Sequence, residues 1–425
     1  MIVDDLRSSS SGGKCEISAR VRRDGSELPR LYFRFPEQFA PAQADGSPFL
    51  AGLLVYAMRA REDITLDAPV SPRLLESLDR IFTVYSSFFP GEMRPISVSA
   101  PPSAPPPPAE LTGSFFTRGV DSWFAVLTAL EDDRQTPPLT HLVFCPDFLP
   151  RDSWSDELVE AKTAQTRDAA GATGCEFIIV ETNQKPVYRG HQLTAMALAL
   201  GFSRMLIPSS GMLGELIPRA THPELDPLFS TERTEILHYG NASRMQKVAR
   251  VARSPDALRT LRVCRFNRAE RDINCGRCEK CIRTMIHLHL VGALDRARDV
   301  FEHPLEPRAV AVMSKEILHP HQWVDLLHAL GDSAEDRALA AAIRLVIVRA
   351  HLRNAYEQIR AHGGDGELAA LRPDLPEALK NAHEVVRRIH RGLDPQAPPQ
   401  GAARRRVVRS AVTRAIRVNQ SAARE

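Results

Sequence analysis

The sequence lacks the long apolar runs and the dense cysteine spacing that define several protein classes. No stretch of the 425 residues approaches the roughly 18 consecutive apolar residues of a membrane-spanning helix. The first residues, MIVDDLRSSSSGGK, also lack the basic segment and apolar core of an export signal. Only seven cysteines occur, and four of them lie between residues 264 and 281, which does not suit a disulfide framework. We therefore expect a cytoplasmic protein with no membrane span.

Aromatic residues are also scarce, at 6%, but the overall composition is that of a folded protein. Hydrophobic residues make up 43% and charged residues 25%, which excludes a disordered chain. The length is two to three times that of a usual domain, so a single small module is excluded and two or three domains are expected.

Neither sign of charge dominates, but the charge is unevenly placed. The last 25 residues hold seven Arg and one Glu, so this segment carries +6 and the remaining chain carries −3 of the total of +3. A basic terminal segment is typical of binding to an acidic partner such as RNA or a membrane surface. A packed or solvated terminal helix is the simpler interpretation, and both stay open.

A proline-rich segment, residues 101–109, predicts a stiff linker because it lacks backbone donors. Residues 1–100 before it predict a small α+β domain. Two alternating strands flank the turn-forming Asp24-Gly25, and two helices follow, the second beginning at the cap signal Ser71-Pro72.

From residue 110 the pattern changes to short apolar runs that alternate with helical stretches. Such alternation predicts an α/β domain with a parallel sheet over residues 110–303. The expected strands are 111–116, 141–145, 176–182 and 204–210, and the expected helices are 121–132, 156–171 and 190–201. Residues 304–425 predict a helical region, with helices over 313–331, 334–362, 375–392 and 403–418.

A turn that suits phosphate follows the first expected strand of this domain. It consists of Thr117, Arg118, Gly119, Val120, Asp121 and Ser122. A strand that turns directly into a helix directs backbone N–H groups and the positive end of the helix dipole at one point, which favours an anion. An ordinary helix cap has the same Asp-Ser pattern, so the turn alone does not identify the ligand.

Four cysteines form the second group with a chemical signature. Cys264 precedes Cys275, Cys278 and Cys281 in a C-x10-C-x2-C-x2-C pattern that supplies four thiolates to one tetrahedral ion. Zinc is the usual occupant, and a closed four-thiolate zinc site is structural. An iron–sulfur cluster and buried free cysteines are the alternatives. For the nearby His287 and His289 we expect ordinary helix roles.

Together the two motifs resemble the ATP pyrophosphatase (PP-loop) family. The segment Thr117–Ser122 resembles its Ser-Gly-Gly-x-Asp-Ser signature, with Thr117 in place of the first Ser and Arg118 in place of the first Gly. A side chain at that glycine position either alters the loop or adds its charge near the phosphates. With the four cysteines, residues 110–290 resemble the 7-cyano-7-deazaguanine synthase branch, which implies an adenine-nucleotide hydrolase-like sheet, ATP, Mg²⁺ and Zn²⁺.

The resemblance also implies roles for single residues. Asp121 would organise magnesium or the loop, Ser122 would contact a phosphate, and Arg233 would hold the outer phosphates. A surface salt bridge is the alternative role for Arg233. Cys145 and Asp147 would lie near the adenosine. The loop after the fourth strand offers four polar residues for an acceptor site or for turns: Ser209, Ser210, His222 and Asp226.

Three functional hypotheses follow. The first is an AMP-forming ligase or synthase that adenylylates the carboxylate of a small acceptor, which ammonia or a sulfur donor then attacks. The second is a zinc-stabilised scaffold that binds RNA through the Arg404–Arg417 segment without using ATP. The third is a tRNA-modifying enzyme that uses both features. A homo-oligomer stays open in all three.

Overall fold

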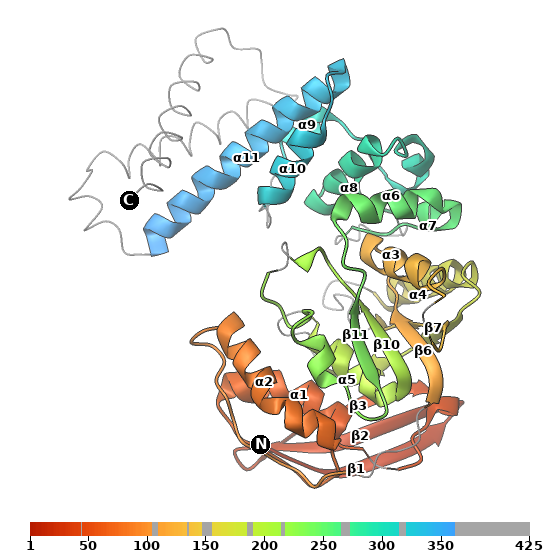
Figure 1. Ribbon diagram of the computed structural model, residues 1–425, viewed down its shortest axis with the longest axis vertical. Helices are drawn as coiled ribbons and strands as arrows, with labels where there is room; N and C mark the ends of the chain where they lie inside the picture. Colours follow the sequence, from red (N-terminus) through yellow and green to blue (C-terminus); the bar gives the residue numbers. More distant parts are fainter. Residues whose placement is uncertain are drawn as a thin grey trace, which may run out of the picture. The chain divides into compact units, whose positions relative to one another are not determined.

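The computed structural model describes most of residues 1–361 (Figure 1). The described segments are 1–43, 45–103, 109–133, 136–146, 155–184, 190–213, 217–264, 273–313 and 320–361. Within these segments, no helix combines the length and apolar character that crossing a membrane requires. The chain divides into two compact units, one of residues 1–263 with 267–273 and one of residues 264–266 with 274–425.

The first unit begins with a mixed sheet in the order β5-β4-β1-β2-β3-β9. Its strands are β1 (Ile2–Ser11), β2 (Lys14–Arg23), β3 (Ser26–Pro36), β4 (Ile64–Leu66), β5 (Val98–Ser99) and β9 (Glu181–Thr182). The predicted hairpin at Asp24-Gly25 is confirmed, because β2 and β3 pair antiparallel and both turn residues have positive φ, 49° and 75°. Strand β1 was not predicted, because its serine run has no alternating apolar pattern.

Both predicted helices of this region are confirmed, as α1 (Ser47–Ala60) and α2 (Pro72–Phe88). Ser71 caps α2, with its hydroxyl accepting a hydrogen bond from the Leu74 amide. Figure 1 shows α1 and α2 on the same side of the sheet. The short 3-10 helix η1 (Glu37–Phe39) follows β3.

A five-stranded parallel sheet forms the rest of the first unit, as the sequence predicts. Its strands are β6 (Ala109–Phe115), β7 (Leu139–Phe144), β8 (Glu176–Ile179), β10 (Phe202–Pro208) and β11 (Glu235–Tyr239). The order is β11-β10-β6-β7-β8, with every pair parallel. Counted along the chain this is 3-2-1-4-5 from β8 to β11, so the order reverses between β6 and β10.

Helices cover both faces of this sheet. Figure 1 shows α3 (Val120–Ala129) and α4 (Asp156–Gly171) on one face and α5 (His191–Leu200) on the other. Helix α6 (Arg244–Arg253) packs on α3 and is followed by α7 (Pro255–Arg259). The 3-10 helix η5 (Asp226–Phe229) precedes β11. Strand β11 was not predicted, and residues 244–253 were assigned to no element.

The predicted boundary at residues 101–109 does not divide the compact units. Strand β9 leaves the α/β region and pairs with β3, from Phe33 to Thr182. One apolar core also runs from Val3 of β1 to Ile236 of β11. Residues 104–108 of the expected linker lie outside the described segments. Shared strands and a shared core therefore join the regions that composition alone separates.

Where the structure describes it, the second unit is mostly helical outside the cysteine region. It contains α8 (Glu279–Leu290), α9 (Pro307–Ala311), α10 (Pro320–Ala329), α11 (Ala334–Ala361) and the 3-10 helix η6 (Asp295–Val300). Helix α11 confirms the helix expected over 334–362. The helices expected over 375–392 and 403–418 lie outside the described residues.

Candidate functional site

The turn at residues 117–122 lies at the carboxyl edge of the parallel sheet, directly after the central strand β6. Its neighbour β10 ends at Pro208, so the turn borders the position where the strand order reverses. Ligands of open α/β folds bind in the crevice outside this position.

Arg118 takes the backbone conformation that normally requires glycine. Its φ is 59°, which costs a residue with a side chain about 1–2 kcal/mol. The side chain is 4% exposed and is directed to α4, where Nε donates to Thr166 Oγ1 at 3.1 Å and a terminal nitrogen donates to Gln165 Oε1 at 3.4 Å. The loop therefore keeps a glycine-like path, and the guanidinium contacts α4.

The hydroxyl of Ser122 forms hydrogen bonds with the backbone on the other side of the turn. It accepts a hydrogen bond from the Thr117 amide at 3.2 Å and donates to the Gly119 carbonyl at 3.1 Å. Gly119 precedes α3 and gives it no side-chain cap, so the first N–H groups of the helix are left to other acceptors. Ser122 therefore shapes an uncapped helix N-terminus.

Two cations converge on Asp121 in the first turn of α3. Asp121 Oδ1 lies 3.2 Å from a terminal nitrogen of Arg244 and 3.4 Å from Lys247 Nζ. Lys247 Nζ also donates to the Ser209 carbonyl at 2.5 Å, and its side chain is 1% exposed. Because Asp121 follows β6 and Ser209 follows β10, Lys247 links the two sides of the strand-order reversal.

The sequence motifs do not point to Arg244 and Lys247. The sequence does contain a pattern that could have identified them. Ser243 and Gln246 form a capping box that starts a helix, and residues 244 and 247 then share one helix face. The sequence does not show that this face packs on α3. Only the contact of α6 with α3 places both cations beside Asp121.

Arg233 lies at the opposite edge of the sheet from the turn, which corrects its expected place near the phosphates. It precedes β11, and Nε donates to the Gly201 carbonyl at 2.8 Å. Burial lowers the Arg233 pKa, and Asp45 opposes this effect. Because β11 runs parallel to β6, a residue before β11 lies at the amino edge.

The residues proposed for an acceptor site differ in burial and in contacts. Ser209 is buried, whereas Ser210 is exposed. Asp226 is fully buried. Its Oδ1 accepts a hydrogen bond from the His222 amide at 3.2 Å, and its Oδ2 lies 2.7 Å from His238 Nδ1. Burial raises the Asp226 pKa, and His238 opposes this effect. His222 and Asp226 thus hold the loop before β11.

Of the two residues expected near adenosine, Cys145 and Asp147, the structure describes only the first. Cys145 is 6% exposed and belongs to the apolar core of the first unit. Asp147 lies outside the described residues.

The four predicted cysteines meet in the second unit. Their sulfurs lie within 4.8 Å of one another, with Cys264–Cys278 at 3.8 Å, Cys275–Cys281 at 3.9 Å and Cys278–Cys281 at 3.4 Å. Four thiolates about 2.3 Å from a tetrahedral ion are about 3.8 Å apart. None of the seven cysteines forms a disulfide, and hydrogen bonds from the other three thiols lower the Cys264 pKa. The cluster is therefore able to bind a metal ion.

Hydrogen bonds of the Asn274 side chain and a close backbone approach at Gly276 hold this cluster. The Cys264 amide donates to Asn274 Oδ1 at 3.0 Å, and the Asn274 side chain donates to the Val300 carbonyl at 2.9 Å. Gly276 has a φ of 68°, and a Cβ there would lie 2.3 Å from the His303 carbonyl oxygen. A glycine is therefore required in the middle of the first C-x-x-C pair.

The two histidines of α8 have contacts outside the cysteine cluster, as expected. His287 Nδ1 is 2.6 Å from the Arg283 carbonyl one turn earlier. His289 Nε2 is 2.7 Å from Asp336 of α11. Neither belongs to the metal-ligand group found among the described residues.

The two sites therefore offer different chemistry: an uncapped helix N-terminus with two cations, and a group of four thiols that is able to bind a metal ion. No protein-family model, curated protein or solved structure matches the chain. The basic segment Arg404–Arg417 lies outside the described residues, so RNA binding stays a prediction.

Proposed function

We propose that the chain binds ATP with its phosphates at the turn 117–122 and adenylylates a carboxylate, releasing pyrophosphate. The observation that carries this proposal is the bridge of Lys247 between Asp121 and the Ser209 carbonyl. It brings a buried cation to the crevice where α/β folds bind nucleotides, beside an uncapped helix N-terminus. The PP-loop resemblance of the same turn supports ATP as the nucleotide.

The strained backbone of Arg118 supports a functional role for the turn. A positive φ at a bulky residue persists only where the surrounding structure holds it, and such outliers cluster at ligand sites. Here the amide of Arg262 donates to the Arg118 carbonyl at 3.0 Å, and the contacts with α4 hold the side chain. The turn is thus fixed before ligand binding.

Asp121 fits the expected magnesium ligand. Both cations contact Oδ1, and among the described residues Oδ2 has no hydrogen bond, while the side chain is 33% exposed. Mg²⁺ in ATP sites commonly takes one or two carboxylates together with the substrate phosphates. Bound there, the ion would offset negative charge on the phosphates.

The chain's own residues then have defined roles in the reaction. An acceptor carboxylate oxygen attacks the α-phosphorus, the bond from that phosphorus to the bridging oxygen breaks, and pyrophosphate leaves. Lys247, Arg244 and the first amides of α3 stabilise the charge that develops on the leaving group. A nitrogen or sulfur nucleophile next attacks the acyl carbon, and AMP leaves with the acceptor oxygen.

An ATP–pyrophosphate exchange assay across a panel of carboxylic acids tests this function. We expect exchange with at least one acid, and its loss in Asp121→Asn. A thermal-shift titration with ATP and Mg²⁺ separates binding from turnover. Absence of both exchange and an ATP-dependent shift would sink the proposal.

For the cysteine cluster we propose zinc in a structural role. The sulfur separations suit one tetrahedral ion, whereas an iron–sulfur cluster spreads its thiolates over several irons. Four protein ligands leave no open position for substrate. Metal analysis by mass spectrometry should give about one zinc per chain, and iron with sulfide in its place would contradict this assignment.

A further inference from the structure

A cavity lies at the amino edge of the parallel sheet, away from the turn 117–122. Its volume is about 390 Å³, within the range of about 300–1,000 Å³ that is typical of small-molecule sites. Nine residues line it: Gln38, Phe39, Ala40, Leu111, His141, Glu176, Leu200, Phe202 and Arg233. They come from η1 and the residue after it, from α5, from the amino-terminal halves of four parallel strands and from the turn before β11, all within the first unit.

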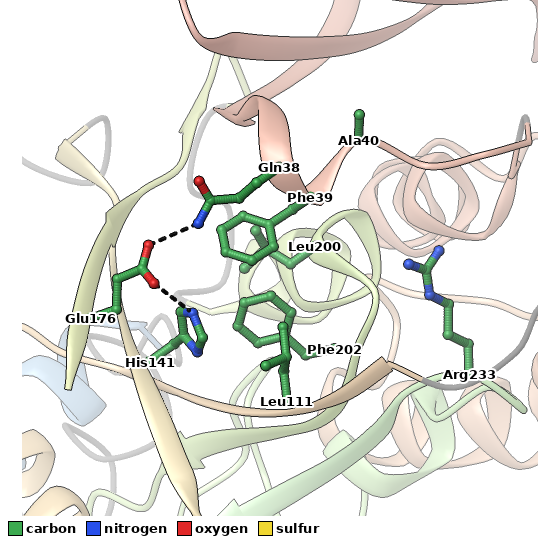
Figure 2. Close-up of a pocket in the computed structure, with 9 residues that line it drawn as sticks. All are labelled: Gln38, Phe39, Ala40, Leu111, His141, Glu176, Leu200, Phe202 and Arg233. Atoms are coloured by element: carbon green, nitrogen blue, oxygen red, sulfur yellow. Dashed lines mark hydrogen bonds and ion pairs between the residues drawn. The ribbon is translucent and has the colours of Figure 1, made fainter.

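Figure 2 shows the polar groups on two opposite sides of this cavity. On one side, the Glu176 carboxylate takes a hydrogen bond from Gln38 Nε2 at 2.9 Å and lies 3.2 Å from His141 Nε2. Burial lowers the His141 pKa, and Glu176 opposes this effect. Glu176 is 52% exposed and keeps acceptor capacity, because a carboxylate has about four lone-pair sites.

The guanidinium of Arg233 forms the other side. Nε donates to the Gly201 carbonyl at the end of α5, and among the described residues the side chain makes no other hydrogen bond. Gly201 has a φ of 62°, which favours glycine, and a Cβ there would lie 2.3 Å from Arg233 Cζ in its present position. The helix end therefore fixes Nε and leaves the two terminal nitrogens for a ligand.

Aromatic and aliphatic side chains separate the two polar sides. Phe39 and Phe202 meet edge to face at 5.1 Å, and His141 lies 5.5 and 5.0 Å from their ring centroids. Leu111 and Leu200 complete the apolar wall. Such a surface favours a flat apolar body over a flexible polar one.

We propose that this cavity binds a small aromatic carboxylate with a hydrogen-bond donor opposite its acid group. The carboxylate pairs with the terminal nitrogens of Arg233, whose planar fork matches it in two parallel hydrogen bonds. The ring lies on Phe39, which the fully buried Phe202 supports edge to face, and the donor reaches Glu176. Because the turn 117–122 is at the other edge of the sheet, this is a second site, and it does not depend on the proposed ATP chemistry.

Calorimetric titration of the full chain with three probes tests the site. 4-Aminobenzoate has both end groups, 4-aminobenzamide lacks the charge, and benzoate lacks the donor. We expect the dissociation constant of 4-aminobenzoate to be lower than that of either other probe by a factor of about ten or more. Each of the other two lacks one hydrogen bond to a charged group, and such a bond contributes about that factor. Equal binding of the three, or no binding in the millimolar range, overturns the proposal.

Variants then assign the binding to named side chains. Arg233→Gln should weaken 4-aminobenzoate binding about tenfold, and Arg233→Lys should restore part of it. The matched control Arg204→Gln removes an arginine that pairs with Glu235 on the same sheet but does not line the cavity, so affinity should not change. Equal affinity in the Arg233→Gln and Arg204→Gln proteins refutes the site.

Two further variants keep the test decisive. Should the Arg233 variant unfold, Glu176→Gln gives the second measurement, because it should remove the preference for 4-aminobenzoate over benzoate. A preference that persists in Glu176→Gln contradicts the proposal. Asp121→Asn should bind 4-aminobenzoate like the parent chain, so failure of the ATP hypothesis and failure of this site are distinguishable.

Discussion

Replacing Lys247 by Met is the sharpest test of the candidate nucleotide site. The side chain is 1% exposed, and its ammonium contacts both the Ser209 carbonyl and Asp121. Met fills a similar volume without the charge. A hydrogen bond to a charged group contributes about 1.5–3 kcal/mol, so we expect the ATP dissociation constant to rise about 10- to 150-fold.

Folding stability should change less than ATP affinity in this variant. The lost hydrogen bonds destabilise the protein, but the ammonium no longer has to be buried, and the two effects partly cancel. We expect the free energy of unfolding to fall by about 2 kcal/mol or less. Urea denaturation measures this change, and calorimetry with ATP and Mg²⁺ measures the affinity.

Arg250→Met is the matched control on the same helix. Arg250 lies one turn beyond Lys247, where it donates to the Leu127 carbonyl at 3.0 Å and pairs with exposed Glu131, away from the turn. Its loss should leave ATP affinity unchanged. If the Lys247 and Arg250 variants bind ATP alike, the reasoning that places phosphates beside Lys247 is wrong.

Four further predictions concern the turn, the metal site and the amino edge. Arg118→Gly should keep ATP affinity within about threefold, because glycine adopts the same positive φ without strain. Cys275→Ser should release zinc, measured with a chromogenic chelator. Gly276→Ala should lower the free energy of unfolding by about 2 kcal/mol or more, since its Cβ meets backbone at 2.3 Å. Burial lowers the His141 pKa below its value of about 6.5 in the unfolded chain. As the pH falls below 6.5, the unfolded state therefore binds more protons than the folded state, and the free energy of unfolding decreases. Urea denaturation from pH 7 to 5 should show this decrease, and His141→Asn should make it smaller.

Each of these has a result that counts against it. A large loss of ATP affinity in Arg118→Gly would show that the guanidinium acts on the ligand. Full zinc content in Cys275→Ser would remove that residue from the metal site. Gly292→Ala is the control for Gly276, because it has a φ of 65° but nothing within 4 Å, and equal costs would exclude the clash. An unchanged pH slope in His141→Asn would assign the slope to other groups.

Local patterns in the sequence determined the secondary structure where periodicity was strong. Apolar runs bounded by turns marked four of the five parallel strands, and Asp24-Gly25 marked the first hairpin. Strand β11 was missed because Glu235–Tyr239 is a short edge strand within a loop-like composition. Strand β1 was missed because exposed serines carry no hydrophobic period.

The candidate sites also differ in whether local sequence patterns predict them. Spacing alone determined the cysteine cluster, because a C-x-x-C pair fixes two ligands on adjacent turns and few other roles explain four such thiols. The turn after β6 was also visible locally, as a strand that runs into a helix. The cluster spans residues 264–281 and the turn spans residues 117–122, so both depend on residues that are near one another in sequence, where chain geometry leaves little freedom.

Only the tertiary structure decided which distant residues join these motifs. Lys247 reaches Asp121 because α6 packs on α3, more than a hundred residues away in sequence. Arg233 was assigned to the phosphates by resemblance, but the direction of β11 puts it at the other edge of the sheet. Sequence periodicity specifies which face of an element is apolar; strand order and direction, which long-range packing selects, determine which side chains share a site.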